Sequence, residues 1–126
     1  MATLTYNHSS KTLAWSGKGR WEAISGPYGK GKLPQGIYKI SRREITLYSS
    51  KVAKGFQDRT GKGFFIPIYP EFKTTRGKQN GRLGIHPDGN VYGTLGCIGI
   101  RKNAKSFYDL IAATAVSSAL TLEVTW

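Results

Sequence analysis

Short runs in which apolar and polar residues alternate, separated by glycine-rich or polar turns, recur along the whole chain. The clearest run is 120–126, Leu-Thr-Leu-Glu-Val-Thr-Trp, which alternates without a break. A period of two is typical of a strand with one buried face, and the 16 glycines supply turn residues. The pattern predicts strands at 4–6, 12–15, 21–25, 37–40, 44–48, 64–69, 82–86, 97–100 and 120–126. Within the most apolar run, Pro67 favours an edge strand or a bulge.

One segment has helical rather than strand periodicity. Phe107, Leu110 and Ile111 recur at helical spacing within 102–116, and Asn103 is a plausible N-cap. The sequence therefore predicts a mainly β (α+β) fold with one helix near the C-terminus. A chain of 126 residues is long enough for a single domain, 1–126, that buries a core without disulfides.

The charge balance indicates an anionic partner. Nineteen Lys and Arg against seven Asp and Glu give a net charge of +12. The basic residues are dispersed from Lys11 to Lys105, which favours general attraction to an anionic polymer over sequence-specific readout of nucleic acid. The first residues lack the pattern of a signal peptide, and no apolar run is long enough to span a bilayer. We expect synthesis in the cytoplasm, with another export route for any work outside it.

The single cysteine, Cys97, is either a buried apolar filler or a nucleophile. His86 precedes it by eleven residues, and glycines at 89, 93 and 96 would let the intervening loop fold back. An imidazole close to the sulfur would favour the reactive thiolate. Gly96 leaves room for a carbonyl carbon and leaves backbone N–H groups open as an oxyanion hole. We therefore interpret Cys97 as a nucleophile and His86 as its base.

Other polar residues have simpler interpretations. His8 lies in a predicted turn and is expected to be a solvated surface residue. Asp88 could orient His86, but Pro-Asp-Gly at 87–89 is equally good turn chemistry, which we favour. Trp15, Trp21 and Trp126 lie in alternating runs, so core packing is expected, with a place in a substrate groove as the alternative.

The stretch 86–100 resembles the catalytic motif of L,D-transpeptidases, the YkuD-like domain, which has a histidine followed by Ser/Thr-x-Gly-Cys and apolar residues. The run 33–40, Leu-Pro-Gln-Gly-Ile-Tyr-Lys-Ile, is also similar to an early strand of that family. The resemblance implies a β-sandwich or barrel in which Cys97 is the nucleophile and His86 the base. It places Thr94 and Gly96 on the motif's Ser/Thr and glycine, and it implies no metal or organic cofactor.

One position departs from the family pattern. Many members have arginine two residues after the cysteine, where this chain has Gly99. A substrate carboxylate could instead meet Arg101 or Arg82, and Tyr92 is a further candidate for substrate binding.

The resemblance implies a peptidoglycan enzyme that cleaves or exchanges the L,D-bond of stem peptides through a Cys97 thioester. Its compact members occur among phage lysis proteins and type VI secretion effectors. We expect a lytic phage endolysin, with a secreted antibacterial effector of the same chemistry as the alternative. The expected partners are stem peptides and anionic envelope polymers of the periplasmic or extracellular wall, and the expected state is a monomer. A basic binding module for cell wall or nucleic acid, with Cys97 inert, is the hypothesis from another class.

Overall fold

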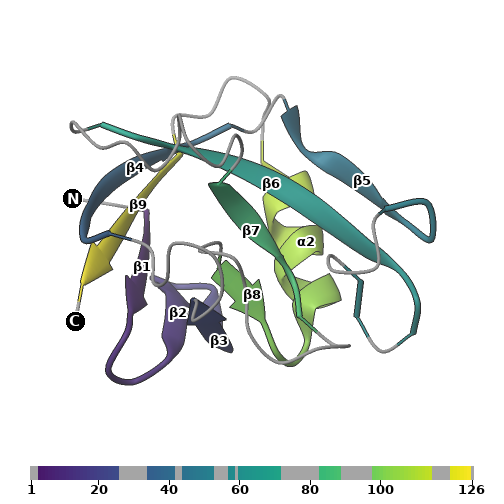
Figure 1. Ribbon diagram of the computed structural model, residues 1–126, viewed down its shortest axis with the longest axis horizontal. Helices are drawn as coiled ribbons and strands as arrows, with labels where there is room; N and C mark the ends of the chain where they lie inside the picture. The colour runs from purple at the N-terminus through teal and green to yellow at the C-terminus, as the bar shows by residue number, and fades with distance from the viewer. Residues whose placement is uncertain are drawn as a thin grey trace.

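The computed structural model describes residues 3–25, 34–41, 44–52, 57–58, 60–71, 83–88, 98–114 and 120–125. These residues form nine strands and one helix, α2 (Figure 1). The bounds are β1 Leu4–Asn7, β2 Thr12–Trp15, β3 Gly19–Ser25, β4 Gly36–Ile40, β5 Thr46–Ser49, β6 Gly63–Pro70, β7 Leu83–Pro87, β8 Ile98–Ile100, α2 Ala104–Ala112 and β9 Leu120–Thr125. The mainly β fold class with one helix near the C-terminus is confirmed.

The strands form one sheet that closes on itself. Their order is β4-β9-β1-β2-β3-β8-β7-β6-β5, and β4 also pairs with β6. That extra pairing joins eight strands into a barrel-like ring and leaves β5 alongside β6. Alternation along the strands then separates an interior from an exterior face, as in β9, where Leu120, Leu122 and Val124 are buried. The predicted β-sandwich or barrel is thus confirmed.

Helix α2 packs its apolar face onto the core. The ring of Phe107 lies edge-on to Trp15 and Trp21, with ring centroids 6.1 and 5.0 Å apart. The indole N–H of Trp21 donates a hydrogen bond to Ser106 Oγ at 2.9 Å. Both tryptophans are less than 8% exposed, which confirms core packing for Trp15 and Trp21. Trp126 lies outside the described residues.

The helix is shorter than the periodicity predicts. Asn103 is its N-cap as expected, but the residue is left-handed, with φ 56°, and its side chain makes no cap hydrogen bond. Its carbonyl instead accepts bonds from the backbone N–H and the hydroxyl of Ser106. In the part of the chain that the structure describes, no helix has the length and apolar character needed to cross a membrane.

The edge or bulge predicted at Pro67 is wrong. Strand β6 pairs with β7 on one side without a register shift, and Pro67 lies opposite Gly84. On its other side β6 pairs first with β5, up to Phe65, and then with β4, from Ile68 onward. The Pro67 carbonyl accepts a hydrogen bond from the backbone of Ser41 on that second side. The N–H and C=O groups of one strand residue point toward the same neighbouring strand. The N–H that Pro67 lacks would therefore point to the side where β6 changes its partner from β5 to β4.

Candidate active site

The parallel pairing of β7 with β8 brings two distant parts of the predicted motif together. In this ladder Ile85 lies opposite Ile98, His86 opposite Gly99 and Pro87 opposite Ile100. Ile98 is the residue that directly follows Cys97 in the sequence. Five of the predicted site residues lie outside the described residues: Cys97, Gly96, Thr94, Tyr92 and Arg82. The described part of the site is therefore His86 with its neighbours, together with Arg101.

His86 is buried, with 4% of its surface exposed. Its Nδ1 lies 2.7 Å from the carbonyl oxygen of Pro87. Because a carbonyl oxygen can only accept, Nδ1 must carry the proton, and in the neutral ring Nε2 is then the basic nitrogen. Burial lowers the pKa of His86 to about 4, and the hydrogen bond to Pro87 opposes this shift. The imidazole is thus neutral at pH 7 and able to accept a proton through Nε2.

An ion pair lies at the end of the same ladder. Arg101 Nη1 donates to the carbonyl oxygen of Asp88 at 2.6 Å and lies 3.4 Å from its Oδ2. The backbone N–H of Asp88 donates to Ile100, and that of Arg101 donates to Glu22. The ion pair and these backbone hydrogen bonds together connect Asp88, at the end of β7, with Arg101, which follows β8, and connect Arg101 with β3. The interpretation of Asp88 as a turn residue did not anticipate this pair, because the partner is thirteen residues away.

His8 is also buried, at 4% exposure, so its prediction as a solvated surface residue is wrong. Its backbone N–H donates to Thr125, and its ring stands edge-on to Tyr6 at 5.0 Å. Both contacts belong to β1 and β9, which are separated from β7 by β2, β3 and β8 on one side of the ring and by β4 and β6 on the other. His8 therefore belongs to a different part of the barrel from His86.

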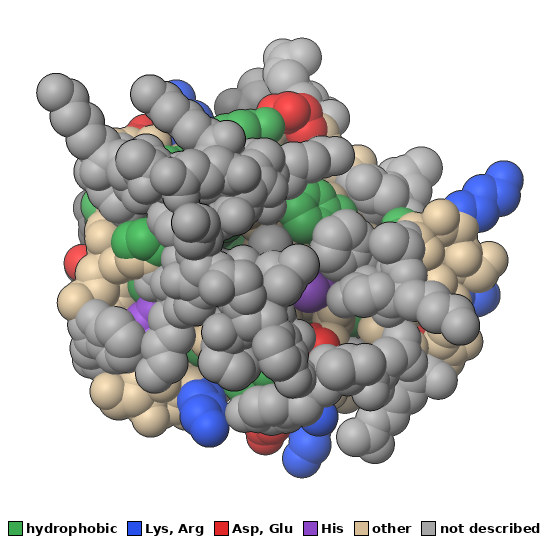
Figure 2. All heavy atoms as spheres, in the orientation of Figure 1, with side chains coloured by type: hydrophobic (Ala, Val, Ile, Leu, Met, Phe, Trp, Pro, Cys, Tyr) green, Lys and Arg blue, Asp and Glu red, His purple; other side chains and the backbone are tan. Residues whose placement is uncertain are grey.

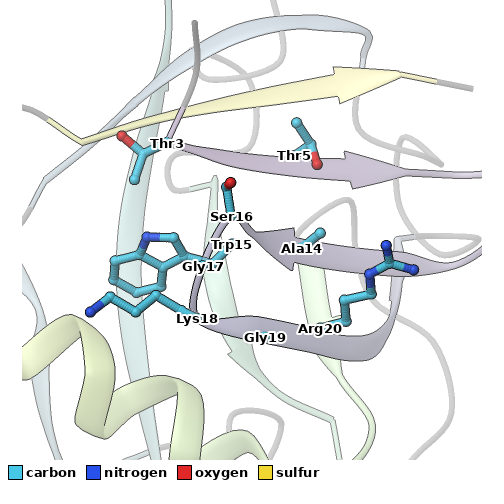
Figure 3. A pocket seen from close by; sticks show the side chains of 9 residues that line it. All are labelled: Thr3, Thr5, Ala14, Trp15, Ser16, Gly17, Lys18, Gly19 and Arg20. Carbon is cyan, nitrogen blue, oxygen red and sulfur yellow. The ribbon is translucent and has the colours of Figure 1, made fainter.

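An open hollow of about 550 Å³ lies on the exterior near the turn between β2 and β3 (Figure 3). Thr5, Ala14 and Arg20 form a cross-strand row along it. The hollow is at the Gly19 end of β3, whereas Ser25 at the other end lies beside Ile98. Gly19 and Ser25 are six residues apart, which is about 20 Å along a strand. Because His86 lies near the Ser25 end, in the ladder of β7 with β8, the hollow is remote from it.

Charged side chains of the described residues are scattered over the face drawn in Figure 2. Figure 2 shows their basic side chains around the outline of one face, without a single basic patch. Within the described ranges, no group of three or more His, Cys, Asp or Glu residues is arranged to hold a metal ion.

The comparison with known protein families identifies the chain. A model of the YkuD L,D-transpeptidase catalytic domain matches residues 3–117. A search of curated proteins finds no match. The family match spans nearly the whole chain, and the closed sheet with one helix agrees with it. The chain belongs to the YkuD family of L,D-transpeptidase catalytic domains, which are cysteine-dependent enzymes of peptidoglycan.

Proposed function

We propose that this protein cleaves or exchanges the L,D-bond of peptidoglycan stem peptides through a thioester on Cys97, with His86 as the base. The pairing of β7 with β8 carries the proposal. Adjacent strands and a one-residue offset put the Cα atoms of His86 and Ile98 about 6 Å apart. Cys97 directly precedes Ile98 in the sequence, so a single peptide bond separates the proposed nucleophile from this residue.

The protonation state of His86 suits this role. Its Nδ1–H is held by the Pro87 carbonyl, so Nε2 takes the proton from the Cys97 thiol as the sulfur attacks. Because the pKa of His86 is lowered to about 4, its imidazole is neutral at rest and is free to accept the thiol proton. The proton moves during attack, and the imidazolium that forms then donates it to the departing amine.

The covalent steps balance without a cofactor. The sulfur forms a bond to the peptide carbonyl carbon, and the electron pair moves onto oxygen, where backbone N–H groups around Gly96 and Cys97 stabilise the charge. Collapse of this intermediate breaks the C–N bond and leaves a thioester on Cys97. Water then releases the shortened stem, or an amine of a second stem forms a new amide, and either restores the thiol. By family resemblance the bond joins a diamino acid (meso-diaminopimelate or lysine) to D-alanine or to a cross-linking residue.

Positive charge close to the ladder supports binding of a substrate carboxylate. Arg101 follows β8 and Arg82 precedes β7 in the sequence, and Tyr92 lies between His86 and Cys97. One terminal nitrogen of Arg101 already binds Asp88, which holds the guanidinium at the end of the ladder. We propose that Arg101 or Arg82 attracts the substrate carboxylate, with Tyr92 as a further contact.

The biological role we propose is lysis of the bacterial wall, as in a phage endolysin, acting from the periplasmic or extracellular side. The net charge of +12 supports retention on anionic envelope polymers. A type VI secretion effector with the same chemistry is the second candidate, supported by the same charge and motif.

Muropeptide masses before and after incubation of purified sacculi with the protein test the activity. Hydrolysis predicts shortened or uncross-linked stems, and exchange predicts stems with a changed terminal residue. Cys97→Ala should fold, bind sacculi and leave every muropeptide unchanged. Wild-type turnover by Cys97→Ala would refute the site. If the wild-type protein binds sacculi and changes no muropeptide, the binding-module hypothesis replaces this one.

A further inference from the structure

The imidazole of His86 lies against an aromatic ring from the neighbouring strand. Ile66 of β6 pairs with Ile85 of β7, so Phe65 and His86 come next along these two antiparallel strands. Their rings are nearly parallel, with an interplanar angle of 15° and centroids 6.2 Å apart. Both residues are 4% exposed. Phe65 thus covers part of the surface of His86 on the face of β7 that points away from the barrel core.

Gly84 is what admits the Phe65 ring to this position. A Cβ atom on Gly84 would lie 2.8 Å from Phe65 Cε1 and closer still to Cζ. It would also lie 2.8 Å from the carbonyl oxygen of Ile66. Gly84 and His86 are two residues apart on β7, so their side-chain positions share one face. The tip of the phenyl ring lies over Gly84, and the ring is stacked beside that of His86.

We propose that Phe65 is a positioning residue: its ring, seated over Gly84, fixes the plane of the His86 imidazole and keeps water from it. The proposal rests on the proposed role of His86 as the base. With the ring plane set by Phe65 and Nδ1 held by the Pro87 carbonyl, the direction of Nε2 is fixed as well. An aromatic side chain suits this task because it is flat, rigid and apolar.

Among the described residues of the neighbouring strands, the charged groups nearest to His86 belong to ion pairs. Across the ladder from His86, β8 contributes Gly99, and beyond it β3 contributes Ile24. The nearest charged groups along these strands are Asp88 with Arg101 and the exposed Glu22, 3.9 Å from Lys102. Desolvation is accordingly the largest cause of the lowered pKa of His86. Removing the ring that excludes water should raise that pKa toward its ordinary value of 6.5.

The test compares Phe65→Leu with Phe64→Leu. Phe64 is the adjacent residue, is fully buried and contacts Tyr108 on the core side, so its truncation costs packing without touching the His86 face. Histidine ring signals are followed by ¹H–¹⁵N NMR as a function of pH. The chain has two histidines, and His8→Gln assigns them. Phe65→Leu should raise the pKa of His86 by about one unit or more, and Phe64→Leu should leave it unchanged.

A kinetic readout and an observation on the wild-type protein complete the test. Phe65→Leu should lower kcat on a stem peptide by about tenfold or more with little change in KM, because misorientation of a base acts on the chemical step.

In the wild-type protein, nuclear Overhauser contacts should join the Phe65 and His86 rings, and the neutral tautomer should carry its proton on Nδ1. Equal pKa shifts in Phe64→Leu and Phe65→Leu would overturn the proposal. Absence of the ring contacts in the wild-type protein would overturn it as well, even if one variant fails to fold. The NMR readouts need no substrate, so an inactive protein with the expected ring contacts would count against the proposed function alone.

Discussion

Acidification should destabilise this protein through His86 in a way that can be calculated. The pKa of this residue is about 4 in the folded chain and 6.5 in an unfolded one. The unfolded state therefore binds more protons than the folded state at any pH below about 7, and stability falls as pH falls. For these two values, His86 removes about 2 kcal/mol between pH 7 and pH 5, and about 3 kcal/mol by pH 4. Most of the loss lies between 6.5 and 4, and it levels off below the folded pKa.

Urea unfolding at half-unit pH steps measures this loss, with His86→Gln as the matched control. Carboxyl groups titrate in the same range in both proteins, so the difference between their pH profiles isolates the imidazole. The free energy of unfolding of the wild type should fall by about 3 kcal/mol more than that of His86→Gln between pH 7 and pH 4. Parallel profiles would show that His86 titrates alike in the folded and unfolded states, and would refute the argument from its burial.

Two further predictions concern charge. Asp88→Ala should cost about 2 kcal/mol in urea unfolding, because it strips a mostly buried guanidinium, that of Arg101, of its carboxylate. Asp109→Ala, which breaks the exposed pair with Lys105, should cost less than about 0.5 kcal/mol, and equal losses in the two variants would contradict the assigned role of the Asp88 pair. Binding of the wild type to purified sacculi should weaken steeply between low and high salt, as measured by co-sedimentation, since it rests on dispersed charge. Binding insensitive to salt would mean that a specific groove does the recognising.

Alternation of apolar and polar residues predicts most of the strands because a two-residue period reports directly on burial of one face. The strand predicted at 120–126 is observed as Leu120–Thr125, and the one at 12–15 is observed unchanged. Pro67 shows where such reasoning ends. A proline excludes a hydrogen-bond donor, but the change of partner from β5 to β4 at this point is set by tertiary pairing, which one strand's sequence does not contain.

The same limit applies to the candidate site. His86 stands out in the sequence because it precedes a glycine-flanked cysteine, but Phe65 carries no local signal, since its contact depends on the pairing of β6 with β7. The sequence Pro87-Asp88-Gly89 is typical of a turn, and this local pattern gives no indication that Asp88 forms an ion pair with Arg101. The prediction for His8 is wrong for a similar reason, because the backbone of this turn residue bonds to Thr125 of β9, which lies more than a hundred residues later.

The most direct test of the central claim is the intact mass of the protein after brief exposure to a purified stem tetrapeptide. An acyl-enzyme on Cys97 predicts a gain equal to the peptide acyl group without its terminal D-alanine, on the wild type and not on Cys97→Ala. Hydroxylamine should remove the added mass, since thioesters are labile to it, and peptide mapping should place it on Cys97. Turnover of the peptide with no adduct under rapid quenching, or an adduct that persists in Cys97→Ala, would contradict a thioester route through this cysteine.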